Sequence, residues 1–223
     1  MSRREDAKAE RRHRIVTAAR DLIRETGDTG LSMRAIASRA GVSLSTPYNL
    51  FGSKRAIVLA VLEDIQDFHA RFARRRPAGA LERIFEALEL SIGYYVQDPD
   101  FYRTLWTGVF DTSGKHDVRA ALAQPERAAF WLALVEAAAA EGALAPGIDA
   151  RLLQRDLDLT FAAVMLHWVL GALDTAELAA TAGYGYALAL SGAAAQGWRE
   201  RLGRRIAEYQ GELERSRLSA AAA

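Results

Sequence analysis

The sequence predicts an all-α protein in which a three-helix N-terminal domain is joined by a long helix to a larger helical domain. Apolar residues recur at helical spacing along most of the 223 residues, and no stretch alternates apolar and polar residues as a half-buried strand does. Gly and Pro separate the periodic stretches. Half of the residues are hydrophobic, which is enough to form a core between such helices.

The first helix is expected over about residues 9–26, with Ile15 and Leu22 on its apolar face. Gly27 is expected to end it, because glycine accepts the left-handed backbone found at many helix termini. Residues 1–8 are expected to be disordered.

Residues 31–54, LSMRAIASRAGVSLSTPYNLFGSK, predict two short helices joined by a tight turn. Ser32 is a good N-cap for the first of them, and Gly41 ends it. Two helices with a glycine-containing turn of this length form a helix-turn-helix, whose second helix enters the DNA major groove. On this pattern alone, the alternative is an ordinary helical hairpin.

The second helix of the pair is expected to be capped by Ser43 and to carry Tyr48 and Phe51 on its buried side. The third begins after Ser53 and opens with two cations, Lys54 and Arg55.

Cations in a first helical turn oppose the helix dipole, and Arg34 lies in the same kind of position after Ser32. A bound phosphate is the natural explanation, since helix N-termini attract anions.

The helix that begins at Ser53 is expected to continue to the arginine run before Pro77. About 22 residues span roughly 33 Å at 1.5 Å per residue, which is more than a three-helix DNA-binding unit needs. We therefore expect a DNA-binding domain over residues 9–55, a connecting helix over 53–76, and a second domain over 77–218.

Every later segment is also expected to be helical. One helix ends near Gln97, the next opens with Pro99 at its first position, and Asp149 and Asp174 cap two more. The last begins near Gln196.

Charge is distributed unevenly along the chain. Residues 1–76 contain 16 Lys and Arg against nine Asp and Glu, for a net +7, whereas residues 77–223 carry a net −6. A basic first third is typical of a segment that meets a polyanion. Its N-terminal cations form either a basic arm on DNA or the solvated start of a helix, and they are Arg3, Arg4, Lys8, Arg11 and Arg12.

Composition argues against several other classes. The chain has no cysteine, no apolar signal segment and no apolar stretch suited to a membrane span, so we expect a soluble cytoplasmic protein. It has no phosphate-binding glycine loop, H-E-x-x-H motif or nucleophile elbow, and its four His are scattered. We expect no enzyme activity, no cofactor and no metal site.

From about Arg11 to Leu62 the sequence resembles the TetR family of transcriptional regulators. The matching elements are the helix row ending in Gly30, the segment Ser32-Met33-Arg34-Ala35-Ile36-Ala37, the turn Gly41-Val42-Ser43, then Thr46, Tyr48 and Phe51, and the pair Ser53-Lys54. The resemblance implies a homodimer that binds a palindromic double-stranded DNA operator and is released by a small-molecule effector. The alternative is a DNA-binding regulator without an effector, controlled by a protein partner or by its abundance.

The resemblance also implies DNA-contacting positions. Bases or their neighbours would meet Arg34, Ser45, Pro47 and Asn49, and phosphates would meet Thr46, Tyr48 and Lys54. Proline at position 47 departs from the larger aliphatic residue more usual there. We expect it to impose a tight, 3₁₀-like first turn and a later helix start, and to face the groove.

The second domain is expected to enclose an apolar or aromatic effector. The candidate pocket residues are Tyr102, Trp106, Phe110, His116, Phe130, Trp131, Phe161, Met165, His167 and Trp168. An aromatic row on a helix is equally typical of a packed core. The last two helices, rich in Ala and Gly, are the predicted dimer interface, through Leu178, Leu188, Leu190, Trp198, Leu202, Ile206 and Tyr209.

Overall fold

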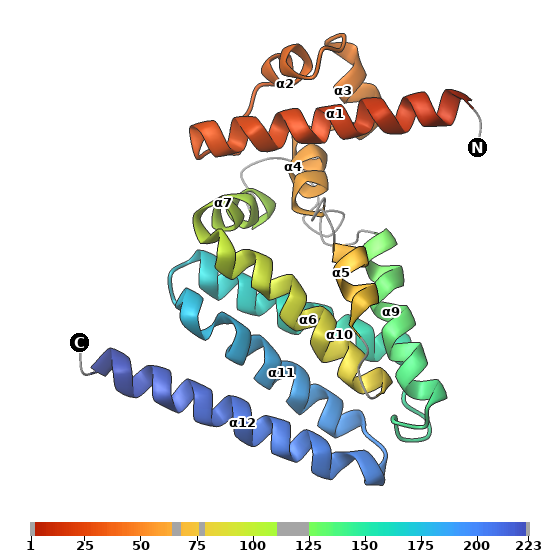
Figure 1. Cartoon of the computed structure of the whole chain (residues 1–223), viewed down its shortest axis with the longest axis vertical. Helices are drawn as coiled ribbons and strands as arrows, with labels where there is room; N and C mark the ends of the chain where they lie inside the picture. The colour runs from red at the N-terminus through yellow and green to blue at the C-terminus, as the bar shows by residue number, and fades with distance from the viewer. Residues whose placement is uncertain (1–2, 64–67, 76–78, 111–124, 222–223) are drawn as a thin grey trace. The chain divides into compact units, whose positions relative to one another are not determined.

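The computed structural model describes residues 3–63, 68–75, 79–110 and 125–221. The named elements of these residues are all helices, so the prediction of an all-α fold is confirmed (Figure 1). An isolated antiparallel bridge joins Leu144 to Ala194. The chain divides into an N-terminal unit, Met1–Gln66 with Asp98–Ala123, and a C-terminal unit, Asp67–Gln97 with Gln124–Ala223.

The N-terminal unit is organised around its first helix, which contacts each of the others. Its core contains Ile15, Ile23, Ile36, Ile57 and Leu105, none of them more than 1% exposed. Its helices are α1 (Arg3–Thr26), α2 (Met33–Arg39), α3 (Ser45–Phe51), α4 (Lys54–Glu63) and α7 (Pro99–Phe110).

Helix α1 begins earlier than the sequence predicts. It starts at Arg3, so the expectation of disorder is wrong for residues 3–8, and two acidic residues, Glu5 and Asp6, occupy the first turn, where they favour the helix dipole. Its end is as expected: Gly27 adopts a φ of +64°.

Helix α7 packs with α1 and α4, although the sequence-based boundaries assign it to the second domain. Its start is as expected, with Pro99 in the first turn after Asp98. The Arg24 side chain of α1 lies 2.8 Å from the Asp98 carboxylate and stacks over the Phe101 ring. The Arg55 guanidinium donates to the Val109 carbonyl. These are contacts between segments far apart in sequence, so local patterns do not reveal them.

The C-terminal unit confirms several predicted helix boundaries. Asp149 accepts hydrogen bonds from the N–H groups of Arg151 and Leu152, at 2.8 and 3.0 Å. The predicted connecting helix corresponds to α4 and α5, and its middle, residues 64–67, lies outside the described residues. The elements of this unit are α5 (Phe68–Arg74), α6 (Ala80–Gln97), α9 (Pro125–Ala140), α10 (Ala150–Val169), η1 (Thr175–Glu177), α11 (Leu178–Ala193) and α12 (Gln196–Ala221).

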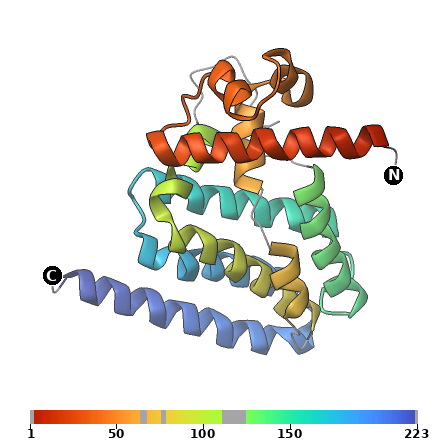
Figure 2. The same cartoon turned by 45° about the horizontal axis from the view of Figure 1, so that its top comes forward.

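The last two helices pack closely because a glycine lies where they meet. Helices α11 and α12 run antiparallel, side by side (Figures 1 and 2). A Cβ atom built on Gly183 of α11 would lie 2.3 Å from Cζ of Tyr209 on α12, which is far inside van der Waals contact. The Tyr209 ring also neighbours Phe85 of α6, and its hydroxyl accepts a hydrogen bond from Arg205.

We predict that Gly183→Ala lowers the free energy of unfolding by about 1–3 kcal/mol, because the added methyl group must displace the Tyr209 ring. The control is Gly203→Ala in the middle of α12, where a Cβ atom meets nothing within 4 Å. That substitution is expected to stabilise by about 0.5–1 kcal/mol through helix propensity. Urea unfolding at a fixed protein concentration, followed by circular dichroism, measures both. Equal effects of the two substitutions would contradict the close packing.

Candidate nucleic-acid interface

The turn between α2 and α3 forms as the sequence predicts. The Ser32 hydroxyl accepts a hydrogen bond from the Ala35 N–H at 3.2 Å and caps α2. Gly41 adopts a φ of +63°, and its N–H bonds to the Ser38 carbonyl while that of Val42 bonds to the Ala37 carbonyl. These two bonds form a Schellman motif, which ends α2 and sets the direction of the chain into α3.

The first turn of α3 is tight, as expected from the proline within it. The helix begins at Ser45, one residue later than a Ser43 cap would place it. The Thr46 N–H donates to the Ser43 carbonyl at 2.9 Å, a 3₁₀-type bond. The prediction that the Ser43 side chain caps α3 is wrong: its hydroxyl bonds to the hydroxyls of Ser45 and Thr46 instead.

Pro47 is buried in the N-terminal unit, so the prediction that it faces the DNA groove is wrong. It is the third residue of α3, where a backbone N–H has no partner within the helix, so the missing donor costs no helical bond. Its apolar ring lies on the same edge as the half-buried Leu50 and Phe51, three and four residues further on.

The opposite edge of α3 is exposed and polar. Ser45, Tyr48 and Asn49 share it at the same spacing of three and four residues. Tyr48 is 52% exposed, so the expectation that it lies on the buried side of the helix is wrong. This edge therefore presents a hydroxyl, a phenol and a carboxamide, while Thr46 beside them is half-buried.

Two cations that the sequence predicts to contact DNA are exposed at the starts of the helices before and after α3. Arg34 is the second residue of α2 and Lys54 the first of α4, and neither first turn contains an acidic residue. The Ser53 hydroxyl accepts the Ala56 N–H at 3.2 Å, as its predicted capping role requires. Arg55 differs from Lys54, because its guanidinium bonds to the carbonyl of Val109 on α7.

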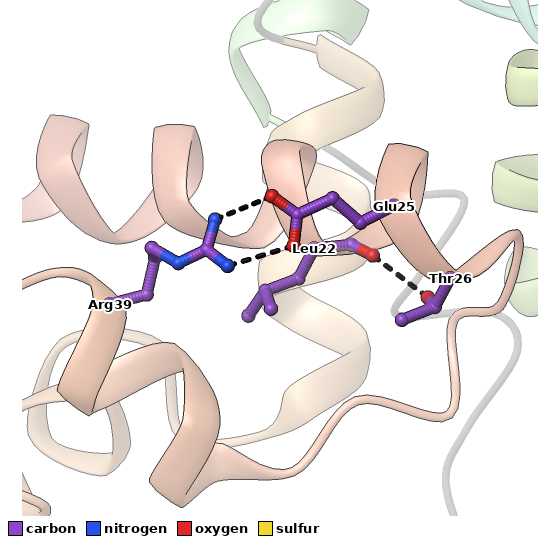
Figure 3. A network of polar contacts seen from close by, with 4 residues as sticks. All are labelled: Leu22, Glu25, Thr26 and Arg39. Carbon is purple, nitrogen blue, oxygen red and sulfur yellow. Dashed lines mark hydrogen bonds and ion pairs between the residues drawn. The ribbon is translucent and has the colours of Figure 1, made fainter.

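An ion pair that the sequence analysis missed joins α2 to α1. Figure 3 shows Arg39 extending from α2 to Glu25 on α1, with two parallel N–H···O bonds of 2.8 Å. The hydrogen bonds from Arg39 lower the pKa of Glu25, and Glu25 raises the pKa of Arg39. The two residues are 14 positions apart on different helices, so no local spacing rule points to the pair.

The predicted effector residues are distributed over both units. In the N-terminal unit Trp106 is buried and stacks on Phe110, and Tyr102 is half-buried. In the C-terminal unit the buried ones are Trp131, Phe161, Met165 and Trp168. Half-buried Phe130 makes edge contacts with Phe68, His69, Phe72 and Trp131. His116 lies outside the described residues.

His167 differs from its neighbours on α10. It is exposed, whereas Phe161, Met165 and Trp168 follow one another at helical spacing on the buried face. The expectation that it offers a polar group inside the helical unit is therefore wrong. Its position in the helix places it off the buried face.

The structure brings together a polar cluster that the sequence analysis did not identify, Arg127 of α9 with Gln154, Asp158 and Tyr186. The guanidinium of Arg127 lies 4.0 Å from the Asp158 carboxylate and over the Phe161 ring, and Gln154 donates to Asp158. Burial raises the pKa of Asp158 and also that of Tyr186 above their ordinary values. In the sequence, the only local indication of this cluster is that Gln154 and Asp158 lie four residues apart, on one face of the helix.

The predicted dimer residues fall into two groups. Leu178, Leu190 and Leu202 are buried inside the protomer and have almost no surface to offer a partner, and Tyr209 is 9% exposed against α11. Leu188 is 47% exposed. Trp198 and Ile206 are half-buried.

Within the described residues no three or more His, Cys, Asp or Glu side chains gather where a metal ion could bind. None of the helices described is long and apolar enough to cross a membrane.

Comparisons with known proteins agree with this geometry. Residues 15–61 match the family model of the bacterial regulatory proteins, tetR family. No curated protein matches the chain.

Solved structures of similar fold span nearly the whole chain. TylP, a TetR regulator from Streptomyces fradiae, is 22% identical with a TM-score of 0.62, and the match covers 92% of this chain and 98% of TylP. RolR bound to resorcinol is 18% identical with a TM-score of 0.62, covering 91% of this chain and 95% of RolR. FadR from Bacillus subtilis bound to stearoyl-CoA is 19% identical with a TM-score of 0.56, covering 81% and 98%.

The helix-turn-helix and the all-α fold thus define a DNA-binding transcriptional regulator. The match of residues 15–61 to the tetR family model confirms the resemblance that the sequence shows over residues 11–62.

We predict that the Glu25–Arg39 pair stabilises the protein at neutral pH and not in acid. The folded-state pKa of Glu25 lies below its ordinary value of 4.5, so the contribution is present above that value and is lost as the pH falls through the folded-state pKa. Arg39→Met should lower the melting temperature at pH 7, and the difference from wild type should shrink toward pH 3.

Thermal unfolding across this pH range makes the measurement. The control is Arg34→Met, which removes another exposed cation from the same helix. A difference for Arg39→Met that is the same at pH 7 and pH 3 would contradict the assignment.

Proposed function

We propose that this protein is a repressor that binds a palindromic operator as a homodimer and releases it when a small, largely apolar effector binds. The observation that carries the DNA-binding part is the division of α3 into two edges. Pro47 is buried on one edge, with half-buried Leu50 and Phe51, and Ser45, Tyr48 and Asn49 are exposed on the other.

The chemistry of the exposed edge fits a DNA groove. A carboxamide such as that of Asn49 makes a bidentate pair with adenine, and Arg34 offers the guanidinium that pairs with guanine. The hydroxyl of Tyr48 and the ammonium of Lys54 suit phosphate oxygens, which position a protein without reading sequence. A homodimer presents two such edges, and operators read by helix-turn-helix dimers have half-sites about 34–36 Å apart.

The proposed effector is an amphipathic molecule with an aromatic or acyl body and a polar group. Two similar structures carry such molecules, resorcinol in RolR and stearoyl-CoA in FadR. In this chain the cluster of Arg127 and Asp158 supports a polar group, since both side chains are about one-third exposed and are separated by 4.0 Å. Buried Phe161 and Tyr95 beside them would contact the body of the effector.

Release requires that the effector bind one arrangement of the DNA-binding units better than another. The effector shifts the population only by its difference in affinity for the two arrangements, and a hundredfold difference corresponds to about 2.7 kcal/mol.

We predict that the full-length protein selects a palindromic site from random-sequence DNA. Asn49→Ala should reduce discrimination at one base pair in each half-site by about 1–3 kcal/mol. Lys54→Ala and Tyr48→Phe should weaken binding to all sequences alike, and Lys54→Ala should lower the slope of log affinity against log salt by about 0.9 per protomer. The affinities for duplexes that differ at one base pair measure the loss of discrimination, and salt titrations of DNA binding measure the change in slope.

The matched controls are Gln97→Ala for the carboxamide and Arg155→Ala for the cation, both exposed in the C-terminal unit. Selection of no site, or loss of binding in the controls as large as in the variants, would contradict operator binding through α3.

We predict that a small aromatic or acyl compound stabilises the protein against heat and releases it from the selected site. Resorcinol and stearoyl-CoA head the library to be tested. A bound ligand raises stability by RT ln(1 + [L]/Kd), so Asp158→Asn should reduce the rise in melting temperature at a given ligand concentration. The control is Asp156→Asn, an exposed carboxylate of the same helix. Stabilisation by no compound, or an equal effect of the two substitutions, would contradict this effector site.

A further inference from the structure

The first part of α1 extends beyond the packed part of the N-terminal unit. From Arg4 to Arg14 the side chains are exposed except for half-buried Ala7, and burial begins abruptly at Ile15, which is 0% exposed. The segment Arg3–Arg14 is helical throughout and is about 18 Å long at 1.5 Å per residue. These turns contribute no side chain to the apolar core, so packing does not explain which residues they carry.

The exposed segment carries cations on the helix face that is apolar further along. Arg4, Lys8, Arg11 and Ile15 follow one another at intervals of four, three and four residues, which places them along one face. Two of the acidic residues, Asp6 and Glu10, lie four apart on a different face. Residues 3–14 contain six Lys and Arg against three Asp and Glu. The face that packs on the other helices thus changes from apolar to basic where the packing stops.

Two contacts place this basic face beside the helix-turn-helix. The Arg12 guanidinium donates to the Leu50 carbonyl at 3.2 Å and stacks 4.2 Å from the centre of the Phe51 ring, both at the end of α3. A guanidinium nitrogen of Arg14 lies 3.9 Å from the Cβ position of Gly41 in the turn before α3. Lys8 and Arg11 lie four residues and one residue before Arg12, which is within about one helical turn. In both views the first turns of α1 extend past α3 (Figures 1 and 2).

We propose that Lys8 and Arg11, with Arg4 beyond them, bind the backbone phosphates of duplex DNA that flanks the operator. The inference rests on the proposed operator binding and extends it to a second surface. Charge complementarity selects the partner, because a row of exposed cations that lies beside the end of a DNA-reading helix is close to the same polyanion. Arg12 acts as a positioning residue, since its guanidinium is bonded to α3.

This surface predicts a longer operator contact than α3 alone requires. A segment about 18 Å long spans up to about five base pairs at 3.4 Å each. Phosphate contacts carry no sequence information, so the flanking DNA contributes to affinity and to salt dependence but not to base preference.

The test uses full-length protein and the duplex that it selects, made with ten random flanking base pairs on each side and also without flanks. The variant is Lys8→Gln/Arg11→Gln, which removes two charges and keeps good helix formers. The control is Arg151→Gln/Arg155→Gln, which removes two exposed charges from α10. A second variant, Lys8→Arg/Arg11→Lys, keeps both charges. Circular dichroism compares the helix content of all four proteins.

On the flanked duplex, Lys8→Gln/Arg11→Gln is expected to lower the salt slope by about 1.8 per protomer relative to wild type and control. On the unflanked duplex the difference should largely disappear, and Lys8→Arg/Arg11→Lys should bind like wild type. The bases selected should stay the same in every variant.

Two failures are distinguishable. If wild type selects a site and the Lys8→Gln/Arg11→Gln protein matches the control on both duplexes, the second surface is overturned and operator binding stands. If wild type selects no site at any salt concentration, operator binding itself fails and the second surface fails with it.

Discussion

What α3 offers to DNA depends on how its inner edge is packed. A helix of seven residues has little stability of its own, because nucleation costs more than so few hydrogen bonds return. Its position therefore comes from the contacts of that edge, which are the burial of Pro47 and the bond from Arg12 to the Leu50 carbonyl. The Schellman motif at Gly41 and the tight turn at Thr46 leave the incoming chain few other directions. The polar edge stays exposed because the apolar edge, with Pro47, Leu50 and Phe51, is the one that packs against the rest of the unit.

The N-terminal unit is stabilised by cations as well as by its apolar core. Arg39 joins α2 to α1, Arg12 joins α1 to α3, Arg24 joins α1 to α7, and Arg55 joins α4 to α7. The excess of positive charge in this part of the chain thus has two uses. Some guanidinium groups are bonded within the unit, whereas Arg34, Lys54 and Lys8 are exposed at its surface.

The C-terminal unit combines close packing with partly buried charge. Gly183 lets the Tyr209 ring approach α11, and Trp168 donates its indole N–H to Thr175, so these aromatics are fully engaged in the core. Asp158 and Arg127 are different, because burial of a carboxylate disfavours its charged form and a separation of 4.0 Å returns only part of the lost hydration. Partly buried charges of this kind, which lower the stability of a core, are typical of binding sites.

Local signals in the sequence determined the all-α fold, the helix-turn-helix and most helix ends. Ser32, Gly41, Ser53, Pro99 and Asp149 act at their own positions, because capping and left-handed turns depend only on neighbouring backbone groups. The resemblance to the TetR family also follows from such local residues, because the matching motifs lie within residues 11–62. Only the tertiary structure decided which side of α3 faces outward, that α7 packs with α1 and α4, and that Arg127 meets Asp158. In each of these cases the partners are distant in sequence, so a pattern read along one helix contains no information about the surface that covers it.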